Sequence, residues 1–349
     1  MIVNIQLLRG LAALAVAFYH AGYVVPGTIY SDFLAVPIFF VISGFIMTHI
    51  TRESADAFLL HRAIRIIPLY WLTSAFYAAL VVIVYPLLGK QSDNIVTVAS
   101  FLSDLFFIPR LDSSGEVIYP VLSVGWTLNL EMWFYLLFAA ALLISRRFAP
   151  AIVAGIVGAV WLCGPLLPPP FLFYAHNYVI FFPLGILAYY AVQLPIAQSA
   201  AGLVAALGGA AALISFAMTD SSTMRFVAPP SIVLGAVLLE RGGFAFRYRL
   251  AMALGSSSYA LYLCHAIVIG SFREAAKRVG LLDMTTHLPA ALLAVATSSI
   301  IAWLIFNWIE NPLLSFLRAN RLTSALSSPK TLPSHRKAVA LSPSPPEIP

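Results

Sequence analysis

The stretch LLRGLAALAVAFYH, residues 7–20, is as apolar as a membrane-spanning helix except for Arg9 near one end and His20 at the other. An arginine at the centre of a span costs about 2.5–3.5 kcal/mol on insertion scales, so such a residue needs a partner or a function. Arg9 can snorkel to the membrane surface, and His20 can hydrogen-bond inside a packed bundle. In a helix, however, the eleven positions between them cover about 1100°, about 20° beyond three turns, and about 16 Å of axis. Both side chains therefore share one face near opposite leaflets, which snorkelling does not require and which favours a functional pair.

The composition of the whole chain is typical of a membrane protein. Hydrophobic residues make up 61% of it and charged residues 10%, whereas a soluble globular chain has about 25% charged residues. Apolar runs of about 20 residues predict transmembrane helices. They occur near residues 5–25, 31–50, 66–88, 121–145, 150–167, 175–194, 199–218, 226–240, 250–271 and 288–308. The run 226–240, which starts with Pro229 and Pro230, is the weakest of them. The sequence thus predicts an all-α polytopic membrane protein, a bundle of about ten transmembrane helices.

The positions of lysine and arginine predict the orientation, because cytoplasmic loops collect these residues. With the N-terminus in the cytoplasm, the cytoplasmic segments contain Arg52, Arg62, Arg65, Arg146, Arg147, Arg241, Arg247, Arg249, Arg318, Arg321, Lys330, Arg336 and Lys337. The outer segments contain Lys90, Arg110, Arg225, Arg273, Lys277 and Arg278. With Arg9 set aside, thirteen lysines and arginines fall in the cytoplasmic segments and six in the outer segments. This bias predicts that both termini lie in the cytoplasm. Topology thereby accounts for the net charge of +6.

Two segments fall outside the predicted spans. Residues 89–120 form the longest outer connection and have a partly apolar middle, and loops of this length are often lids or binding loops. From about Leu322 the chain is rich in Ser and Pro, which is typical of a disordered segment. The predicted organisation is a transmembrane domain over residues 1–318 and a disordered cytoplasmic tail over residues 319–349.

Several kinds of chemistry lack their sequence signals. Cys163 and Cys264 both fall within predicted spans, which argues against a disulfide framework or a zinc site, and we expect no bound metal. The chain contains no G-x-S-x-G, P-loop, H-E-x-x-H or G-x-G-x-x-G motif. It has no basic and aromatic pattern for nucleic acid. It also lacks the matching interrupted helices of an inverted-repeat transporter. The first span has no basic region before it and no cleavage site after it, so we expect it to be retained.

Small and basic residues mark the second and third spans. Ser43 and Gly44 lie in the middle of AVPIFFVISGFIMTHI, residues 35–50, where a small pair normally allows close helix packing. In HRAIRIIPLYW, residues 61–71, Arg62 and Arg65 are three positions apart and therefore share a helix face. They can grip phosphate groups through bidentate contacts. The alternative is that they only provide the positive charge that sets topology.

Acidic residues and a second histidine lie in later spans. SVGWTLNLEMWFYLLF, residues 123–138, places Asn129 and Glu131 in the membrane, where a carboxylate is by default a functional-site hypothesis. We expect Glu131 to meet His20, because a carboxylate can fix the tautomer of a general base; a structural pair of Glu131 with Arg or His is the alternative. In GSSSYALYLCHAIVI, residues 255–269, His265 lies on an apolar face, where a histidine is more often a core residue than a catalyst. Near the end of NWIENP, residues 307–312, we expect Glu310 to cap a helix or to pair with an arginine.

These stretches, taken in order, resemble the acyltransferase-3 family of membrane acyltransferases, especially its branch of exopolysaccharide-production acetyltransferases. The similarity covers about residues 4–315. It includes the spacing of Arg9 and His20 and the stretches IFFVISGFIM, HRAIRIIPLYW, SVGWTLNLEMWFY, SSSYALYLCH and NWIENP. One departure is Pro37, which precedes IFF where the family often has an acidic residue, although Asp32 lies nearby.

The resemblance implies transfer of an acyl group, usually acetyl from cytoplasmic acetyl-CoA, to a hydroxyl of a cell-surface or lipid-linked saccharide. The enzyme would be a multi-pass protein of the inner, cytoplasmic membrane. Its expected partners are membrane lipid, the saccharide acceptor, the acyl-CoA donor and polysaccharide assembly machinery, without nucleic acid and without a tightly bound cofactor. The resemblance ties Arg9 and His20 most closely to activity, with Glu131 beside them and Arg62 and Arg65 as donor contacts. Further motif positions are Ser43, Tyr70, Trp126, Asn129, Ser258, Tyr259, His265 and Glu310.

The resulting hypothesis assigns a phosphate-binding end and a reacting end to the first span. Arg62 and Arg65, with Arg9, hold the phosphates of acetyl-CoA, while His20 either deprotonates the sugar hydroxyl or carries the acetyl group transiently. The alternative function is a transporter or flippase for a lipid-linked saccharide, with the same charges lining its path.

Overall fold

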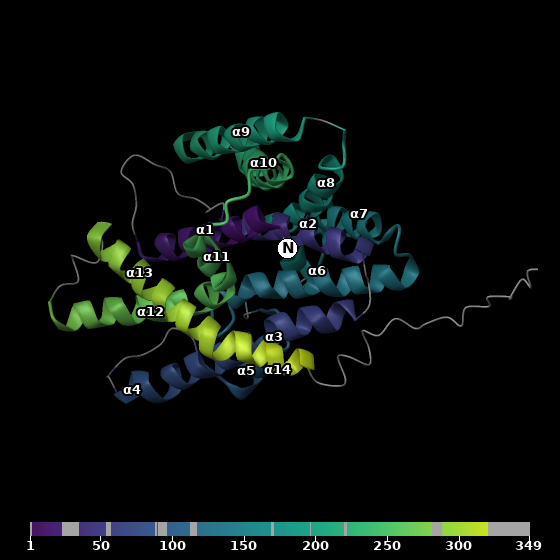
Figure 1. Cartoon of the computed structure of the whole chain (residues 1–349). Helices are drawn as coiled ribbons and strands as arrows, with labels where there is room; N and C mark the ends of the chain where they lie inside the picture. Colours follow the sequence, from purple (N-terminus) through teal and green to yellow (C-terminus); the bar gives the residue numbers. More distant parts are fainter. Residues whose placement is uncertain are drawn as a thin grey trace, which may run out of the picture.

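Long apolar helices form the body of the protein in the computed structural model (Figure 1). The structure describes residues 2–22, 35–53, 57–87, 89, 96–111, 117–168, 171–195, 197–219, 222–280 and 288–319. The predicted tail falls almost wholly outside these residues, as do Asp32 and the segment around it.

The elements follow one another as helices with a single small hairpin. The helices are α1 (Val3–His20), α2 (Ala35–Glu53), α3 (Phe58–Ala79), α4 (Tyr85–Leu87), α5 (Val98–Leu105), α6 (Gly125–Ile144), α7 (Ala149–Leu162), α8 (Phe181–Ala191), α9 (Gln198–Thr219), α10 (Ser222–Arg241), α11 (Arg249–Ser256), α12 (Ser258–Arg278), α13 (Leu288–Ile305) and α14 (Asn311–Ala319). The π-helical turns η1 (Leu80–Val84) and η6 (Phe306–Glu310) join α3 to α4 and α13 to α14. The 3₁₀ turns η2 (Gly164–Leu166), η3 (Phe171–Ala175) and η4 (Asn177–Ile180) separate α7 from α8. The strands β1 (Arg110–Leu111) and β2 (Val117–Ile118) pair antiparallel.

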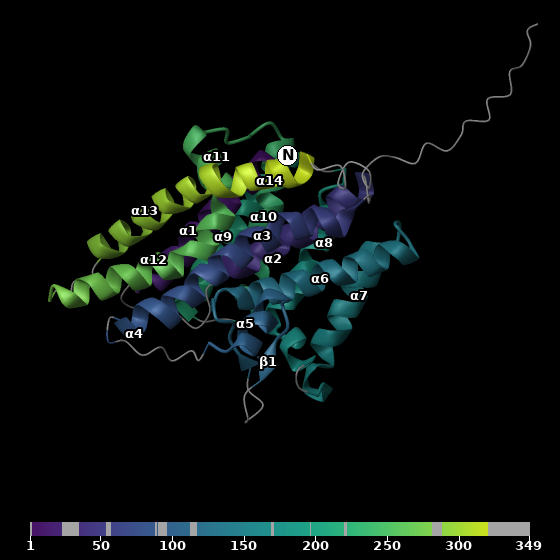
Figure 2. The ribbon, with the colours of Figure 1, turned by 90° about the horizontal axis from the view of Figure 1, so that it is seen from below.

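Helices that are distant in sequence pack side by side around the middle of the bundle. In Figure 1, α1, α2 and α6 run through the centre, α9 and α10 lie together on one side, and α3 and α14 lie on the other. Figure 2 shows the same bundle from below, with α12 and α13 side by side and with α5 and β1 on the side where α7 ends. The buried side chains form one large core that draws on most of the helices.

The number of long spans is smaller than the ten that the sequence predicts. In the part of the chain that the structure describes, seven helical stretches are long and apolar enough to cross a membrane, or eight if α11 and α12, bent by 70° at their junction, count as one. The predicted ranges 150–167 and 175–194 coincide with shorter apolar helices, Ala149–Leu162 and Asn177–Ala191. Glycine and proline follow α7 at once, so the helix ends at Leu162 and the apolar run continues in 3₁₀ turns. The all-helical, polytopic membrane architecture is confirmed, and the weakest predicted run, 226–240, lies within the span Thr223–Arg241.

Glycines allow the closest helix contacts, as expected for Gly44. A Cβ on Gly44 would lie 2.1 Å from the backbone oxygen of Phe182, and a Cβ on Gly185 would lie 2.1 Å from the backbone oxygen of Val41. The backbones of α2 and α8 therefore touch, which only small residues permit. The same holds for α1 and α11, where a Cβ on Gly255 would lie 2.3 Å from the backbone oxygen of Gln6.

Charged side chains near one end of the bundle cap helix termini. Glu240 accepts hydrogen bonds from the amides of Val3 and Asn4 at 2.9 and 2.7 Å, where the first turn of α1 has unpaired N–H groups. Arg146 donates to the backbone oxygens of Thr51 and Arg52 at the end of α2. Arg146, one of the charges that the sequence assigns to topology, thus also satisfies a helix end.

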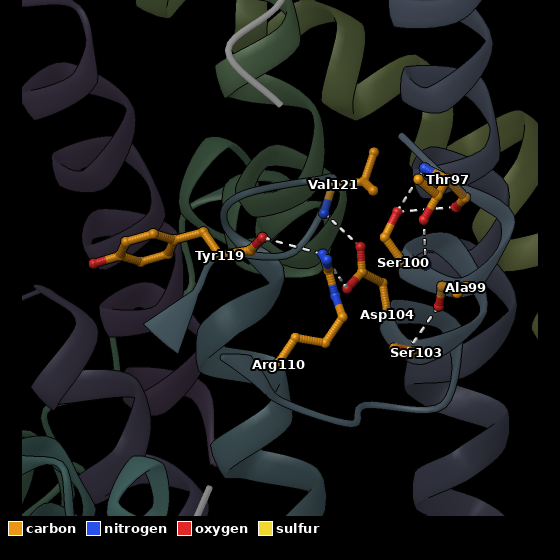
Figure 3. Close-up of polar contacts among 8 residues, drawn as sticks. All are labelled: Thr97, Ala99, Ser100, Ser103, Asp104, Arg110, Tyr119 and Val121. Carbon is orange, nitrogen blue, oxygen red and sulfur yellow. Dashed lines mark hydrogen bonds and ion pairs between the residues drawn. The ribbon is translucent and has the colours of Figure 1, made fainter. Parts of the chain in front are cut away.

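The segment 89–120 contains a buried carboxylate that ties it to α6 (Figure 3). Asp104 of α5 is 2% exposed and accepts a hydrogen bond from the amide of Val121, just before α6. Arg110 of β1 lies 3.4 Å from the same carboxylate and 3.5 Å from the backbone oxygen of Tyr119. Thr97 and Ser100 cap α5 reciprocally. Burial raises the pKa of Asp104, because desolvation outweighs the help from Val121 and Arg110.

We predict that Asp104 makes the stability of the protein depend on pH in the acid range. Since the pKa is raised on folding, the folded state holds the proton more tightly, and stability falls as pH rises from the usual carboxyl pKa through the raised one. Asp104→Asn keeps an acceptor for Val121 and should remove this slope. Asp104→Ala leaves that amide unpaired and should cost about 1–3 kcal/mol at every pH. Thermal unfolding of the purified protein between pH 3 and 7 measures both effects, and an unchanged slope in Asp104→Asn would contradict the assignment.

Candidate active site

A cavity of about 380 Å³ lies inside the bundle and collects most of the polar residues that the sequence singles out. Its walls come from α1, α2, α3, α6 and α12. The predicted site residues that line it are Arg9, Ser43, Arg62, Arg65, Glu131, Ser258 and Tyr259. The remaining predicted positions lie outside this lining: His20, Tyr70, Trp126, Asn129, His265 and Glu310.

Three arginines give the cavity a strongly positive wall. Arg62 and Arg65 share one face of α3, one turn apart, and Arg9 reaches the same space from α1. Arg9 donates to Gln6 at 3.2 Å, and Nε of Arg62 has no hydrogen-bond partner among the described residues. Glu131 is the one carboxylate that lines the cavity with them among the described residues. An anion that brings several acceptor oxygens would satisfy these donors.

Glu310 holds one of the three arginines in place. Its carboxylate lies 3.5 Å from Nη1 of Arg65, and the side chain is 2% exposed. It comes from the π-helical turn η6, which lies between α13 and α14. The expected pairing of Glu310 with an arginine is therefore confirmed.

Glu131 is fixed by two hydroxyl groups. Ser43 of α2 donates to Oε1 at 2.6 Å, and Tyr135, one turn further along α6, donates to the same oxygen at 2.5 Å. Ser43 thus orients a carboxylate, while its neighbour Gly44 provides the close helix contact. Tyr135 also lines the cavity, although it is not among the predicted site residues. Its position four residues after Glu131 is the signal that could have found it.

The predicted contact between His20 and Glu131 is not formed. The hydrogen bonds of Glu131 go to Ser43 and Tyr135, and those of His20 go to Val16 and His265. His20 and Glu131 were expected to meet because both lie in the outer half of the membrane in the predicted spans. Equal depth in the membrane does not determine which face of each helix turns towards the other. Glu131 faces the cavity with Arg9, while His20 lies at the last residue of α1.

His265 takes the place beside His20. Nε2 of His265 lies 3.3 Å from Nδ1 of His20, and the ring centroids are 5.0 Å apart. His265 is fully buried, whereas His20 is exposed at the end of its helix. The two residues are separated by most of the chain, so no local pattern links them.

Residues one turn apart on α12 bind three other helices. The hydroxyl of Tyr259 donates to the backbone oxygen of Ile66 on α3 at 2.8 Å. The hydroxyl of Tyr262 lies 2.6 Å from Oγ1 of Thr127 on α6, and His265 contacts His20 on α1. The stretch SSSYALYLCH therefore joins the arginine-bearing helix α3, the Glu131 helix α6 and His20 of α1. Tyr262 was not selected from the sequence, although its spacing from Tyr259 and His265 is a visible signal.

Two other predicted positions are buried outside the cavity lining. Tyr70 is fully buried, its ring stacks on that of Phe107 with centroids 5.0 Å apart, and it leaves no room for a Cβ on Gly125. Asn129 is 3% exposed and lies on α6 outside the cavity lining. Pro37 lies in the first turn of α2, where proline is tolerated.

Trp126 belongs to a second cavity of about 350 Å³. This cavity lies between the residues before α6, the first turn of α6 and the η3–η4 segment. It is lined by Tyr119, Trp126, Leu172, Phe173, Ala175, His176 and Asn177. The next residue of α6, Thr127, lines the first cavity, so the two cavities share the start of this helix.

Comparison with known proteins identifies the family. The model of the acyltransferase-3 family, described as an acyltransferase domain, matches residues 2–308. The exopolysaccharide production protein ExoZ of Rhizobium meliloti is 33% identical over 304 residues, which cover 84% of this chain and 92% of that protein. The peptidoglycan O-acetyltransferase OatA of Listeria monocytogenes is 24% identical over 354 residues, 89% of this chain and 55% of the longer OatA. No solved structure matches the chain. With the family model matched over most of its length, this multi-pass membrane protein belongs to the acyltransferase-3 family of O-acyltransferases.

Proposed function

We propose that this protein transfers an acetyl group from acetyl-CoA to a hydroxyl group of a cell-surface or lipid-linked saccharide. One observation carries the proposal. Three arginines from two helices converge on a cavity inside a membrane bundle, and a histidine lies further along the same α1 helix that supplies Arg9. This is the arrangement that a donor with charged phosphates and a long neutral arm requires.

The donor assignment rests on charge. A diphosphate group offers several oxygens, and guanidinium groups bind such groups in a bidentate manner. Arg62 and Arg65 are one turn apart, so that both can reach one diphosphate, and Arg9 stands opposite them. Because Arg9 and His20 are eleven positions apart, about 16 Å along the helix, the acyl end of an extended donor can reach the other end of α1.

The acceptor assignment rests on the relatives. One is an exopolysaccharide production protein and another acetylates peptidoglycan, so a saccharide hydroxyl is the acceptor that their names share. The bias of lysine and arginine supports cytoplasmic termini, which puts the arginine cluster on the side where acetyl-CoA is made. The inner membrane is then the site of the reaction, next to the machinery that assembles the polysaccharide.

The chemical step is an ester exchange. The sugar oxygen attacks the thioester carbonyl, its proton passes to His20, the carbon–sulfur bond breaks, and the thiolate leaves and regains that proton as free CoA. If His20 first attacks the carbonyl itself, the acetyl group rests on the imidazole before it passes to the sugar oxygen. Both routes consume one thioester and one hydroxyl and yield one ester and one thiol.

We predict that His20→Ala abolishes O-acetylation, because a positioned base contributes about 10²–10⁴-fold to such a transfer. The ester content of the surface polysaccharide, measured in cells that carry only the variant, checks this. His61→Ala is the matched control, since His61 lies on α3 outside the cavity lining and should leave the ester content unchanged. Polysaccharide must still be made in the His20→Ala cells. Its loss would favour a transporter, and normal acetylation would refute the role of His20.

We also predict that Arg62→Ala and Arg65→Ala raise the KM for acetyl-CoA by about 10–100-fold, because each removes a charged hydrogen bond worth about 1.5–3 kcal/mol. Arg65→Lys should recover only part of this loss, since an ammonium cannot make the bidentate contact. Arg147→Ala is the control, because Arg147 lies between α6 and α7, over the ring of Phe148 and outside the cavity lining. The KM for acetyl-CoA is measured from acetyl-transfer kinetics with the purified variants. An unchanged KM in both Arg62→Ala and Arg65→Ala would exclude this donor site.

A further inference from the structure

Both ring nitrogens of His265 have defined neighbours. Nδ1 lies 3.1 Å from the backbone oxygen of Leu261, one turn earlier on α12, and Nε2 lies 3.3 Å from Nδ1 of His20. The side chain is fully buried. The tyrosine one turn away, Tyr262, is anchored to Thr127 on α6. The imidazole of His265 is therefore held at both edges in a packed environment.

The neighbours determine where the protons are. A carbonyl oxygen only accepts, so Nδ1 of neutral His265 carries the hydrogen and Nε2 is an acceptor. Nδ1 of His20 faces that acceptor and also the backbone oxygen of Val16 at 3.0 Å, so it must be the protonated nitrogen. Neutral His20 then has its lone pair on Nε2, the nitrogen that a base or a nucleophile needs.

We propose that His265 is a positioning residue that sets the ring orientation of His20 and, together with the backbone oxygen of Val16, fixes its tautomer. This inference rests on the proposed function, in which His20 reacts. A carboxylate often fills this role for a catalytic histidine. Here the acceptor is a neutral, buried imidazole, and the carboxylate expected from the sequence is held elsewhere by Ser43 and Tyr135.

The test compares substitutions that keep or remove the acceptor. His265→Leu fills the space without an acceptor and should lower kcat at least tenfold, with the KM for acetyl-CoA unchanged because the arginine cavity is intact. His265→Gln places an amide oxygen close to the position of Nε2 and should restore most of the rate. Cys264→Ala, at a buried neighbour that does not touch His20, is the control and should leave the rate unchanged.

A double variant separates positioning from structural support. If His265 acts through His20, His20→Ala with His265→Leu should be no slower than His20→Ala alone, because residues that act as a unit are not additive. A further loss in the double variant, or normal kinetics in His265→Leu, overturns the inference. If His20→Ala itself retains transfer activity, the role of His20 in the proposed function fails instead, whereas loss of the polysaccharide in those cells counts against the proposed function itself. The His265→Gln variant keeps the test decisive if His265→Leu does not fold.

The second cavity supports an independent inference about the acceptor. Among the residues that the structure describes, its lining contains aromatic rings and polar groups but no lysine, arginine, aspartate or glutamate. The first cavity, with three arginines, has the opposite character. A neutral ligand with hydroxyl groups and apolar ring faces fits such a lining, whereas a polyphosphate does not.

The polar groups of this cavity are oriented. Oδ1 of Asn177 accepts a hydrogen bond from Nε1 of Trp161 at 3.2 Å, so its amide nitrogen is left as a donor. Nδ1 of His176 accepts from the amide of Tyr178 at 3.2 Å, so in the neutral ring Nε2 carries the hydrogen. Trp126 lies beside His176, with ring centroids 5.1 Å apart. The geometry points to a subsite for one sugar ring of the acceptor, stacked on Trp126; this also rests on the proposed function.

The test compares the effect of each variant on the KM for the acceptor with its effect on the KM for acetyl-CoA. Trp126→Ala should raise the KM for the cell's own polysaccharide, chemically freed of its esters, at least fivefold and leave the KM for acetyl-CoA unchanged. Trp126→Phe should retain most of the affinity, because it keeps an aromatic face. Trp308→Ala, at an exposed tryptophan of η6, is the control. An unchanged acceptor KM in Trp126→Ala, or an equal rise for both substrates, overturns the subsite.

Discussion

The charge balance inside the bundle is the constraint on which the site depends. Arg9, Arg62 and Arg65 face one cavity, and like charges in an apolar surrounding repel one another strongly. Glu310 pairs with Arg65 at the edge of the cavity, and Glu131 stands within it. Two carboxylates against three guanidinium groups leave an excess of positive charge. An anion bound in the cavity would compensate that excess.

The same balance explains why the site draws on residues from the whole chain. Arg9 comes from the first helix, Glu131 from α6 and Glu310 from the turn before α14. The bundle must close before these charges can meet, so the site is complete only in the folded membrane protein. The contacts of α12 with α1, α3 and α6 make this closure specific.

Much of this arrangement could be predicted from the sequence. The eleven-residue spacing of Arg9 and His20, the one-turn spacing of Arg62 and Arg65 and the apolar runs are local patterns, and they indicate the helices and the residues that share a face. The partner of His20 could not be predicted, because the approach of α12 to α1 is a tertiary contact across most of the chain. Tyr135 was missed although it follows Glu131 by one turn. Two of the predicted spans are short helices, because hydropathy reports apolar length and does not show where glycine and proline end a helix.

The bend between α11 and α12 has an electrostatic consequence. Because the chain turns by 70° near Ser257, α12 begins inside the bundle, and Ser258, Tyr259 and Tyr262 from its first turns line the arginine cavity. The N-terminus of a helix carries a partial positive charge from its aligned peptide dipoles. The backbone of α12 thus adds a positive potential to that of the arginines at the cavity. The cavity keeps part of its attraction for anions even where Glu310 neutralises Arg65, and this contribution, unlike that of a side chain, cannot be removed by a point substitution.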